Sequence, residues 1–471
     1  MKRALVVLAL VACGTPNVPE PVTPAATAPA PPPPPAAPDP WRLPPRAEGK
    51  PAPKAAPAVS LDAWKKLKKS ASPGSCSAFA MRRAATPVPG SIDEALVETD
   101  AAKRDALLVA LEGLDARIVR ADVAPVECAD VLAEPVLAKK TQVEGEAEHA
   151  LVGLALAARL ARTAQGAPVM PAGATKAQVK TFIAGPLRKW MLEQATTIEQ
   201  LSVAGRELVG YGRGVAAVEA GTADLRLVDS IRSSPTPKEW DQELRGIYEA
   251  QLDEALEPRK ARGRDAALVG LGELARAGAL NDARVSRARV LLSKLYGGRR
   301  IDALDGLLVP PPDATEAAPS SYWRHRKLAD GTLKPTARSH FEAGRLYWER
   351  SAFIEAAYGY REAKTPDERL LLANALALAS GPANAAEMMR APLALSQTEA
   401  LDALASENAA SAGAAAYDAA HLRSLATMGA PNATPLADVA TRFENAAKLL
   451  TDPAQKQKAT ERAAETRAAT R

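Results

Sequence analysis

The chain has 471 residues, of which 47% are hydrophobic and 4% aromatic, and its 60 basic and 55 acidic side chains leave a formal net charge of +5. This near balance does not indicate a nucleic-acid-binding protein, whose basic residues usually gather on one face. The length exceeds the roughly 250–300 residues at which a single hydrophobic core stops growing. We therefore expect several domains or a stacked array.

The N-terminus has the pattern of an export signal. Lys2 and Arg3 precede an apolar stretch over residues 4–12, which is too short to span a bilayer because a spanning helix takes roughly 20 residues. The sequence Leu10-Val11-Ala12-Cys13 that ends this stretch resembles the lipobox of bacterial lipoproteins. The alternative is a cytoplasmic protein with an apolar start and a buried free cysteine.

The lipobox resemblance implies that residues 1–12 are a signal peptide and that Cys13 becomes a lipidated first residue. Several acyl chains would anchor the protein stably to a membrane. Gly14 stands where an aspartate commonly retains lipoproteins at an inner membrane, so we expect the outer membrane of a bacterial cell envelope, with the protein facing the periplasm.

Residues 13–58 are expected to form a disordered, proline-rich tether. Positions 14–58 hold 17 of the 39 prolines, and a polyproline II chain of that length would reach about 140 Å. Such a tether suits contact with the cell wall or a neighbouring membrane, and a generic spacer is the alternative. Within it, Trp41 with Arg42 and Arg46 forms a candidate docking motif.

The remaining chain is rich in Ala, Leu, Arg and Glu, which favours helices and an all-α fold. Apolar residues from Leu244 to Leu256 have helical spacing, and Pro258 is expected to end that helix. Asn281 or Asp282 is expected to cap the next helix, which Gly297 and Gly298 would end. A Thr434-Pro435 pair indicates a further helix start.

Residues 341–366 resemble a tetratricopeptide repeat. In this family, small residues allow two antiparallel helices to approach closely and aromatic residues fill the gaps, and Pro366 would end the second helix. Weaker matches occur at 204–217 and 288–308. The resemblance implies a solenoid of helical hairpins, with a plain α-helical bundle as the alternative. Its signature residues are Ala343, Gly344, Tyr347, Ala356, Tyr360 and Ala363.

Cys76 and Cys128 are the cysteines that remain once Cys13 is lipidated. In an oxidising compartment an even number favours a disulfide between them, and two buried free thiols are the alternative.

The cluster around Trp323, Arg324 and Arg326 is a candidate ligand contact, because guanidinium groups beside aromatic rings could bind an anionic glycan, a lipid head group or an acidic partner. A solvated connector is the alternative.

We find no catalytic or cofactor motif in the sequence. The four histidines are scattered, so a zinc site is not expected. The glycines at 210, 212 and 214 look like part of a dinucleotide-binding loop, but helical spacing precedes them where a strand is required, so close helix packing explains them better. We therefore expect no cofactor, no metal and no enzymatic activity.

Together these patterns predict a non-catalytic scaffold that binds protein partners in the cell envelope and does not bind nucleic acid. Binding to peptidoglycan, or an unrecognised activity on it, is the alternative. The expected regions are a signal peptide (1–12), a tether (13–58), an N-terminal helical region (59–142), a helical hairpin array (143–310), a connector loop (311–335) and a tetratricopeptide-like region (336–471).

Overall fold

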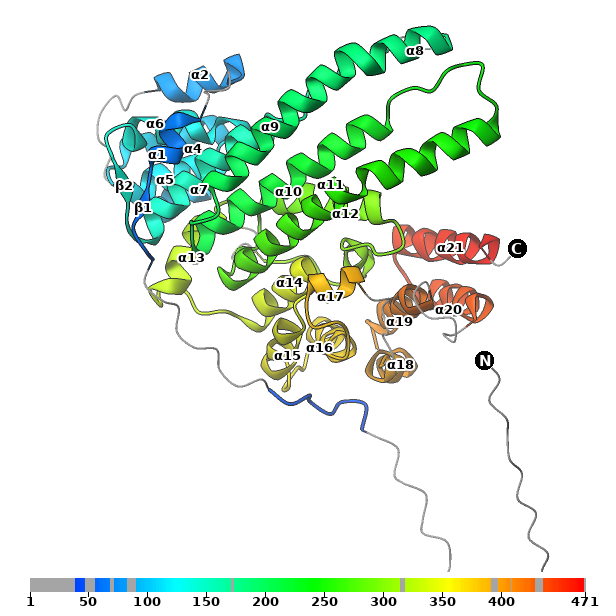
Figure 1. Ribbon diagram of the computed structural model, residues 1–471. Helices are drawn as coiled ribbons and strands as arrows, with labels where there is room; N and C mark the ends of the chain where they lie inside the picture. The colour runs from blue at the N-terminus through cyan, green and yellow to red at the C-terminus, as the bar shows by residue number, and fades with distance from the viewer. Residues whose placement is uncertain are drawn as a thin grey trace, which may run out of the picture. The chain divides into compact units, whose positions relative to one another are not determined.

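The computed structural model describes residues 39–46, 56–67, 72–82, 90–170, 173–313, 318–390, 397–407, 409–427 and 435–469. The predicted signal peptide and Cys13 lie outside these ranges. Residues 40–471 form one compact unit, shown in Figure 1. The prediction of an all-α fold is confirmed, since most of the described residues are helical.

The N-terminal part combines short helices with two short strands. The strands pair antiparallel, with Val59 opposite Val143 and Ser60 opposite Gln142. The elements are β1 (Val59–Ser60), α1 (Asp62–Lys66), α2 (Gly74–Met81), α3 (Ile92–Val97), α4 (Ala101–Ala110), α5 (Leu114–Val123), the 3-10 turn η1 (Val126–Cys128), α6 (Ala129–Leu137) and β2 (Gln142–Val143).

The central part contains the longest helices. Its elements are α7 (Gly145–Ala161), α8 (Lys176–Phe182), the π-helical turn η2 (Ile183–Leu187), α9 (Arg188–Ala204), α10 (Gly210–Arg232), α11 (Gln242–Arg276), α12 (Ala283–Tyr296) and the 3-10 turn η3 (Ala303–Gly306). Helix α10 packs against both α7 and α11, and in Figure 1 α10 and α11 are drawn in green to the right of α7.

Glycine lets α7 and α10 touch through their backbones. A Cβ on Gly212 would lie 2.1 Å from the carbonyl oxygen of His149, and one on Gly153 would lie 2.1 Å from that of Gly212. No larger residue fits at either position without separating the helices. The glycines that follow α9 therefore serve helix packing, as the sequence analysis preferred.

The C-terminal part is a succession of helices that begins inside the predicted connector. Its elements are α13 (Ser321–Ala329), α14 (Ala337–Tyr347), α15 (Arg350–Gly359), α16 (Pro366–Leu378), α17 (Ala385–Arg390), α18 (Glu399–Ser406), α19 (Ala412–Thr427), α20 (Leu436–Leu449) and α21 (Pro453–Ala468). The predicted connector loop over 311–335 thus contains the helix α13. The Ser320 hydroxyl caps this helix by accepting from the Trp323 N–H (3.1 Å).

One continuous hydrophobic core runs from β1 to α19 and crosses the expected boundaries at 142 and 310. A second, smaller cluster joins α19 to α20 and α21 around Tyr417 and Phe443. The helical regions distinguished in the sequence therefore share buried surface.

The prediction that Pro258 ends a helix is wrong. Helix α11 continues from Gln242 to Arg276 with Pro258 inside it. Beyond the proline, Ala267, Leu271 and Leu274 are fully buried and α11 packs closely on α10, so tertiary burial outweighs the lost hydrogen bond. The apolar face expected before the proline is not buried at its start, because Leu244 is 48% exposed.

The sequence predicts a helix cap at Asn281 or Asp282, and Asp282 is the residue that caps α12. The Asp282 carboxylate accepts from the Arg284 N–H (2.8 Å), and α12 ends at Tyr296 directly before Gly297. Helix α20 begins directly after Pro435, while Thr434 lies outside the described residues.

Candidate interaction surface

The residues of the predicted repeat signature lie where α14, α15 and α16 meet. Helices α14 and α15 are joined by Trp348 and Glu349 alone and pack on each other. A Cβ on Gly344 would lie 2.7 Å from the Phe353 ring, so the glycine allows this close contact. Of the remaining signature residues, Tyr347, Ala356 and Tyr360 are buried and Ala343 and Ala363 are half-buried.

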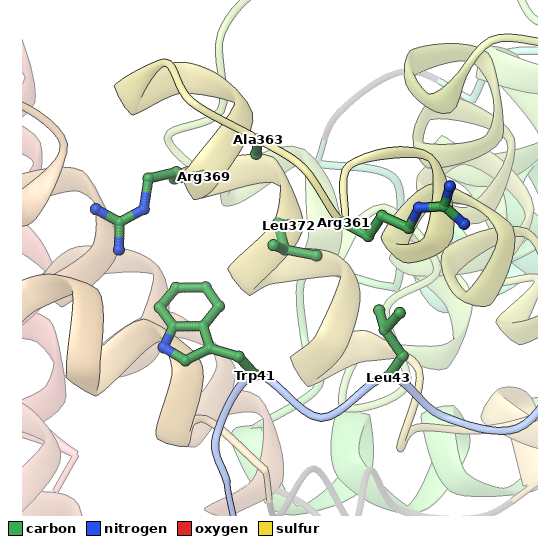
Figure 2. Close-up of a pocket in the computed structure, with 6 residues that line it drawn as sticks. All are labelled: Trp41, Leu43, Arg361, Ala363, Arg369 and Leu372. Carbon is green, nitrogen blue, oxygen red and sulfur yellow. The ribbon is translucent and has the colours of Figure 1, made fainter.

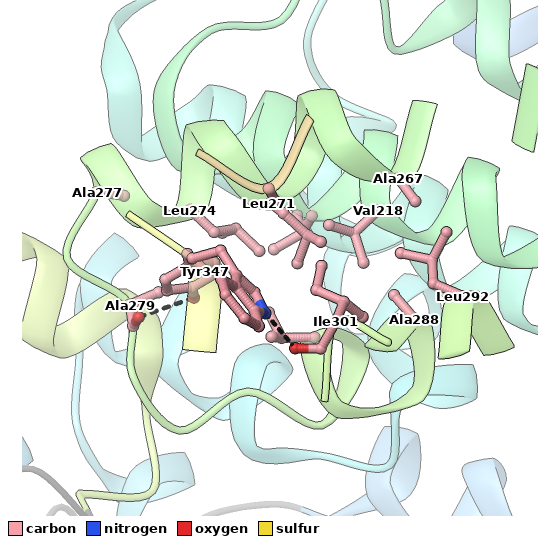
Figure 3. Close-up of a cluster of buried hydrophobic side chains, with 14 of the residues drawn as sticks. Val218, Ala267, Leu271, Leu274, Ala277, Ala279, Ala288, Leu292, Ile301 and Tyr347 are labelled. Carbon is pink, nitrogen blue, oxygen red and sulfur yellow. Dashed lines mark hydrogen bonds between the residues drawn. The ribbon is translucent and has the colours of Figure 1, made fainter. Parts of the chain in front are cut away.

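The end of α14 is fixed in the core of the central helices. The Tyr347 hydroxyl donates to the carbonyl of Ala279 (2.8 Å), and the Trp348 indole N–H donates to that of Ile301 (2.6 Å). Figure 3 shows these bonds beside apolar side chains of α10, α11 and α12. Trp348 is not among the residues predicted from the sequence, yet it is 2% exposed and has a left-handed backbone (φ 52°).

Pro366 begins a helix and does not end one, contrary to prediction. Helix α15 has already ended at Gly359, and Thr365 caps α16. The Thr365 hydroxyl accepts from the Glu368 N–H (3.2 Å), while the Glu368 carboxylate accepts from the Thr365 N–H (3.3 Å). This capping box places proline at the first helical position, where its missing N–H costs nothing.

Part of the predicted tether lies on this surface. Residues 40–46, here called the docked segment, pack on α15 and α16 through Trp41, Leu43 and Arg46. The Arg46 guanidinium lies 3.0 Å from the Glu355 carboxylate and 4.2 Å from the centre of the Tyr358 ring. The expectation of disorder is therefore wrong for this part of the tether, while residues 13–38 and 47–55 lie outside the described residues.

A pocket of about 310 Å³ remains between the docked segment and the helices. In Figure 2, Trp41 and Leu43 point from the segment toward α16, with Leu372 between them. Ala363 and two arginines, Arg361 and Arg369, complete the lining. The pocket is thus apolar at its centre and basic at its edges.

Arg369 is held in place by an acidic partner from the next helical layer. Its guanidinium binds both oxygens of Glu407 at 2.5 and 2.7 Å, and it lies 5.4 Å from the centre of the Trp41 ring. The hydrogen bond to Glu407 raises the pKa of Arg369 and lowers that of Glu407, so this pair stays charged. A fixed cation beside Trp41 favours an aromatic ring at that position.

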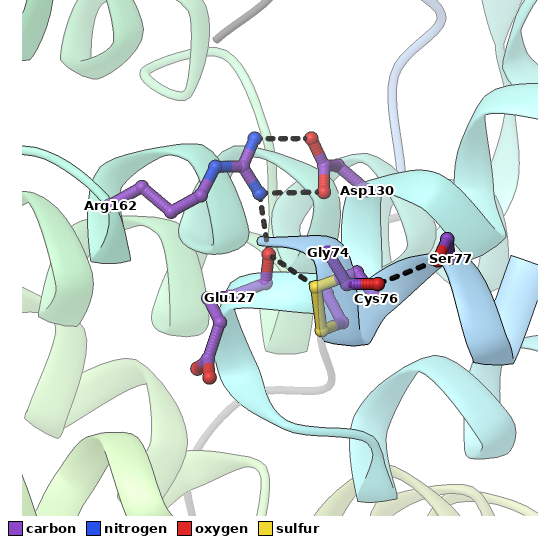
Figure 4. The surroundings of a disulfide bond; sticks show 7 residues. Gly74, Cys76, Ser77, Glu127, Asp130 and Arg162 are labelled. Carbon is purple, nitrogen blue, oxygen red and sulfur yellow. Dashed lines mark hydrogen bonds and ion pairs between the residues drawn. A yellow bond between two sulfur atoms is a disulfide. The ribbon is translucent and has the colours of Figure 1, made fainter. Parts of the chain in front are cut away.

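The predicted disulfide between Cys76 and Cys128 is confirmed, with a Cα–Cα distance of 5.2 Å. It joins α2 to the start of α6. Nearby, the Arg162 guanidinium donates to both oxygens of Asp130 at 2.9 and 2.6 Å, which ties α7 to the same region (Figure 4). The disulfide therefore links two elements of the N-terminal part, and the Arg162–Asp130 pair joins that part to α7.

The cluster proposed as a ligand contact makes internal contacts. Arg324 is 5% exposed and donates from Nε to the carbonyl of Gly278 (3.0 Å). The Trp323 indole N–H donates to Asp93 (3.0 Å), and Arg326 lies 3.6 Å from Asp115. Arg324 thus faces the interior, and a ligand could reach its guanidinium only if α13 moved.

A buried polar cluster that the sequence analysis did not anticipate joins α5, α10, α12 and α13. Arg284 contacts both Asp122 and Asp282, and the Tyr211 hydroxyl donates to Asp122 (2.6 Å). Burial raises the pKa of the Tyr211 hydroxyl, so it remains a proton donor. The Ser320 hydroxyl also donates to Asp122 (2.9 Å). Because Asp122 lies far from these partners in the chain, its sequence neighbours gave no signal.

Within the described residues, no group of His, Cys, Asp and Glu side chains has the arrangement of a metal site, and no helix there is long and apolar enough to cross a membrane. Comparisons with protein-family models, with curated proteins and with solved structures find no match to this chain.

Proposed function

We propose that this protein is a lipid-anchored lipoprotein of the bacterial cell envelope. The export signal and lipobox pattern that end at Cys13 are the reason for assigning the anchor. The disulfide between Cys76 and Cys128 supports export, because such bonds persist in oxidising compartments. Gly14 after the cysteine favours the outer membrane and a periplasmic location.

We further propose that the folded part is a non-catalytic scaffold for protein partners, with tetratricopeptide-like hairpins as its binding elements. The observation that carries this proposal is the docked segment, which is a stretch of polypeptide held on the outer surface of α15 and α16. A helical surface that binds one stretch of chain can bind another of similar chemistry.

The anchor is tested by metabolic labelling with a radioactive fatty acid. We expect the wild-type protein to take up label and to sediment with membranes, and Cys13→Ser to do neither. Cys76→Ser is the matched control because it replaces a different cysteine, one that forms the disulfide with Cys128, and leaves the lipobox intact. Labelling of Cys13→Ser at the wild-type level would refute the anchor.

The scaffold role is tested by crosslinking in intact envelopes and purification of the full chain in detergent. We expect one or more proteins to be crosslinked reproducibly. Recovery of no specific protein, together with sedimentation of the purified chain with isolated cell wall, would favour peptidoglycan as the ligand. Release of soluble fragments from that cell wall would show an enzyme.

A further inference from the structure

The contacts of the docked segment are specific in chemistry but weak in energy. The Arg46 and Glu355 side chains are 54% and 39% exposed, and exposed ion pairs contribute about 0–1 kcal/mol. Trp41 and Leu43 are only half-buried, so each contributes part of its full burial energy. A free peptide with these contacts would bind weakly.

Covalent linkage makes this weak contact sufficient to keep the surface occupied. The docked segment rejoins the fold at residue 56, after residues 47–55. A tethered ligand on a short linker has an effective concentration of about a millimolar, so an affinity of that order suffices for occupancy. A partner with micromolar affinity could therefore displace it.

The docked segment is also prepared for binding by its prolines. Leu43 and Pro44 each precede a proline, which restricts them to extended backbone conformations. Less conformational entropy is then lost when the segment binds. The same advantage would be available to any proline-containing peptide.

The fit of the docked segment leaves space. The pocket of about 310 Å³ lies beside Leu43 and Leu372, where a larger apolar side chain would gain buried area. A peptide from another protein that fills this space would bind more tightly than the chain's own segment.

We infer that the surface of α15 and α16 is a binding site for an extended peptide of a partner protein, and that residues 40–46 are its built-in competitor. The partner peptide contains an aromatic residue that stacks on Arg369, an apolar residue that fills the pocket, and a basic residue that pairs with Glu355. It also contains prolines that keep it extended. This inference rests on the proposed binding function and names the chemistry of its ligand.

The test uses a fluorescent peptide with the sequence of residues 39–46 and the full chain in detergent. We expect Arg46→Glu, which repels Glu355, to open the site and bind the peptide roughly tenfold more tightly than wild type, the factor expected if the segment occupies the site nine-tenths of the time. Glu355→Arg should not bind this peptide measurably.

The matched control reverses the charge of both partners. A peptide in which glutamate replaces the final arginine should bind to the Glu355→Arg variant. The double variant Arg46→Glu/Glu355→Arg should bind this peptide more weakly than Glu355→Arg does, because its own segment docks again. Equal binding of the original peptide by wild type and Arg46→Glu, or undiminished binding by Glu355→Arg, would overturn the inference.

Analytical sedimentation of the same proteins tests whether the surface is occupied by the segment of a second copy of the chain. A wild-type dimer that Arg46→Glu abolishes would show that the segment is exchanged between chains, and the intramolecular competitor would be excluded. If the peptide does not bind while envelope crosslinking still recovers a partner, the inference fails and the proposed function stands.

Discussion

Several charged side chains in this protein are buried together with their counter-charges. Arg284 is 2% exposed and lies between Asp122 and Asp282, whose side chains are 2% and 0% exposed. Burying an isolated charge would be prohibitive, so the three groups are stable only as a set. Because they come from α5 and from the start of α12, they also specify how these helices meet.

Removing the cation from this set should be costly. We expect Arg284→Leu to lower the free energy of unfolding by about 3–5 kcal/mol, because two buried carboxylates lose their counter-charge. Arg232→Leu is the control: its partner Asp253 is 46% exposed, so the loss should stay below about 1 kcal/mol. Urea unfolding followed by circular dichroism measures both, and equal effects would contradict the argument.

Two buried titratable groups on α19 respond to pH in opposite directions. Burial raises the pKa of Asp418 to about 7, although the Leu308 N–H, the Asn374 amide and the charge of Lys458 all oppose this shift. Burial lowers the pKa of His421 to about 4, against its bond to the Ala303 carbonyl and aided by Lys458, Arg462 and Arg300.

The two shifts should nearly cancel in the wild type. Asp418 favours the folded state below its unfolded pKa, and this stability is lost as pH rises from about 4 to about 7. His421 contributes stability above pH 6.5, which is lost as pH falls toward 4. Each group changes the free energy of unfolding by at most about 1.4 kcal/mol per pH unit. Between pH 4 and 6.5 the two changes have opposite signs and therefore nearly cancel.

Single substitutions should reveal the separate slopes. Relative to wild type, we expect Asp418→Asn to gain stability as pH rises from 4 to 7, and His421→Gln to gain stability as pH falls from 6.5 to 4. Urea unfolding at half-unit pH intervals gives both differences. A difference that does not vary with pH for either variant would show that its buried group does not titrate in that range.

At the scale of elements, the helices meet where glycine replaces a side chain. The contact between α14 and α15 depends on Gly344 facing Phe353, and the contact between α7 and α10 depends on Gly212. By contrast, a Cβ on Gly272 of α11 would meet nothing within 4 Å. These two kinds of helical glycine should respond oppositely to the same substitution.

We expect Gly344→Ala to destabilise the protein by about 1–3 kcal/mol, since the Phe353 ring must move. Gly272→Ala should stabilise it by up to about 1 kcal/mol, because alanine favours the helix and finds open space. Thermal unfolding compares the two variants, and a stabilising effect of Gly344→Ala would mean that the hairpin is looser than its glycine contact indicates.

Local signals in the sequence were sufficient for helix content, for the cap at Asp282 and for the pairing of Cys76 with Cys128. They failed where distant parts of the chain decide. Pro258 carries a strong local signal for a helix end, but burial of the residues after it against α10 overrides that signal. Similarly, Trp41 in a proline-rich stretch suggested a docking motif without showing that its binding surface lies more than 300 residues later.

At the scale of the molecule, burial is most extensive in α7 and α10 of the central part and in α16 and α19 of the C-terminal part. Nearly every side chain of α7 from His149 to Ala161 is buried, whereas α8 buries only Val179 among its described side chains and α21 buries mainly small residues. Local opening therefore requires much less exposure of apolar surface at α8 and α21 than at the centre.

Hydrogen exchange should reproduce this difference. We expect the slowest amides in α7 and α10, with exchange in α8 and α21 faster by orders of magnitude, because their opening does not require the whole core to unfold. Mass spectrometry of peptic fragments resolves these helices. Exchange of α21 as slow as that of α10 would indicate that the small cluster around Phe443 opens only with the main core.

Under the anchor proposed at Cys13, the docked segment would also have a mechanical consequence. A pull transmitted along the N-terminal chain would reach Trp41 and Arg46 before it reached β1, since these contacts come first in sequence. The Arg46 ion pair is exposed and Trp41 is only half-buried, so these contacts would detach first. Residues 40–55 would then be added to the chain before the fold, about 55 Å at full extension, because the Pro57 carbonyl is bonded to His149. Because the docked segment can bind again when the force falls, its reversible detachment would limit the force that reaches the core helices.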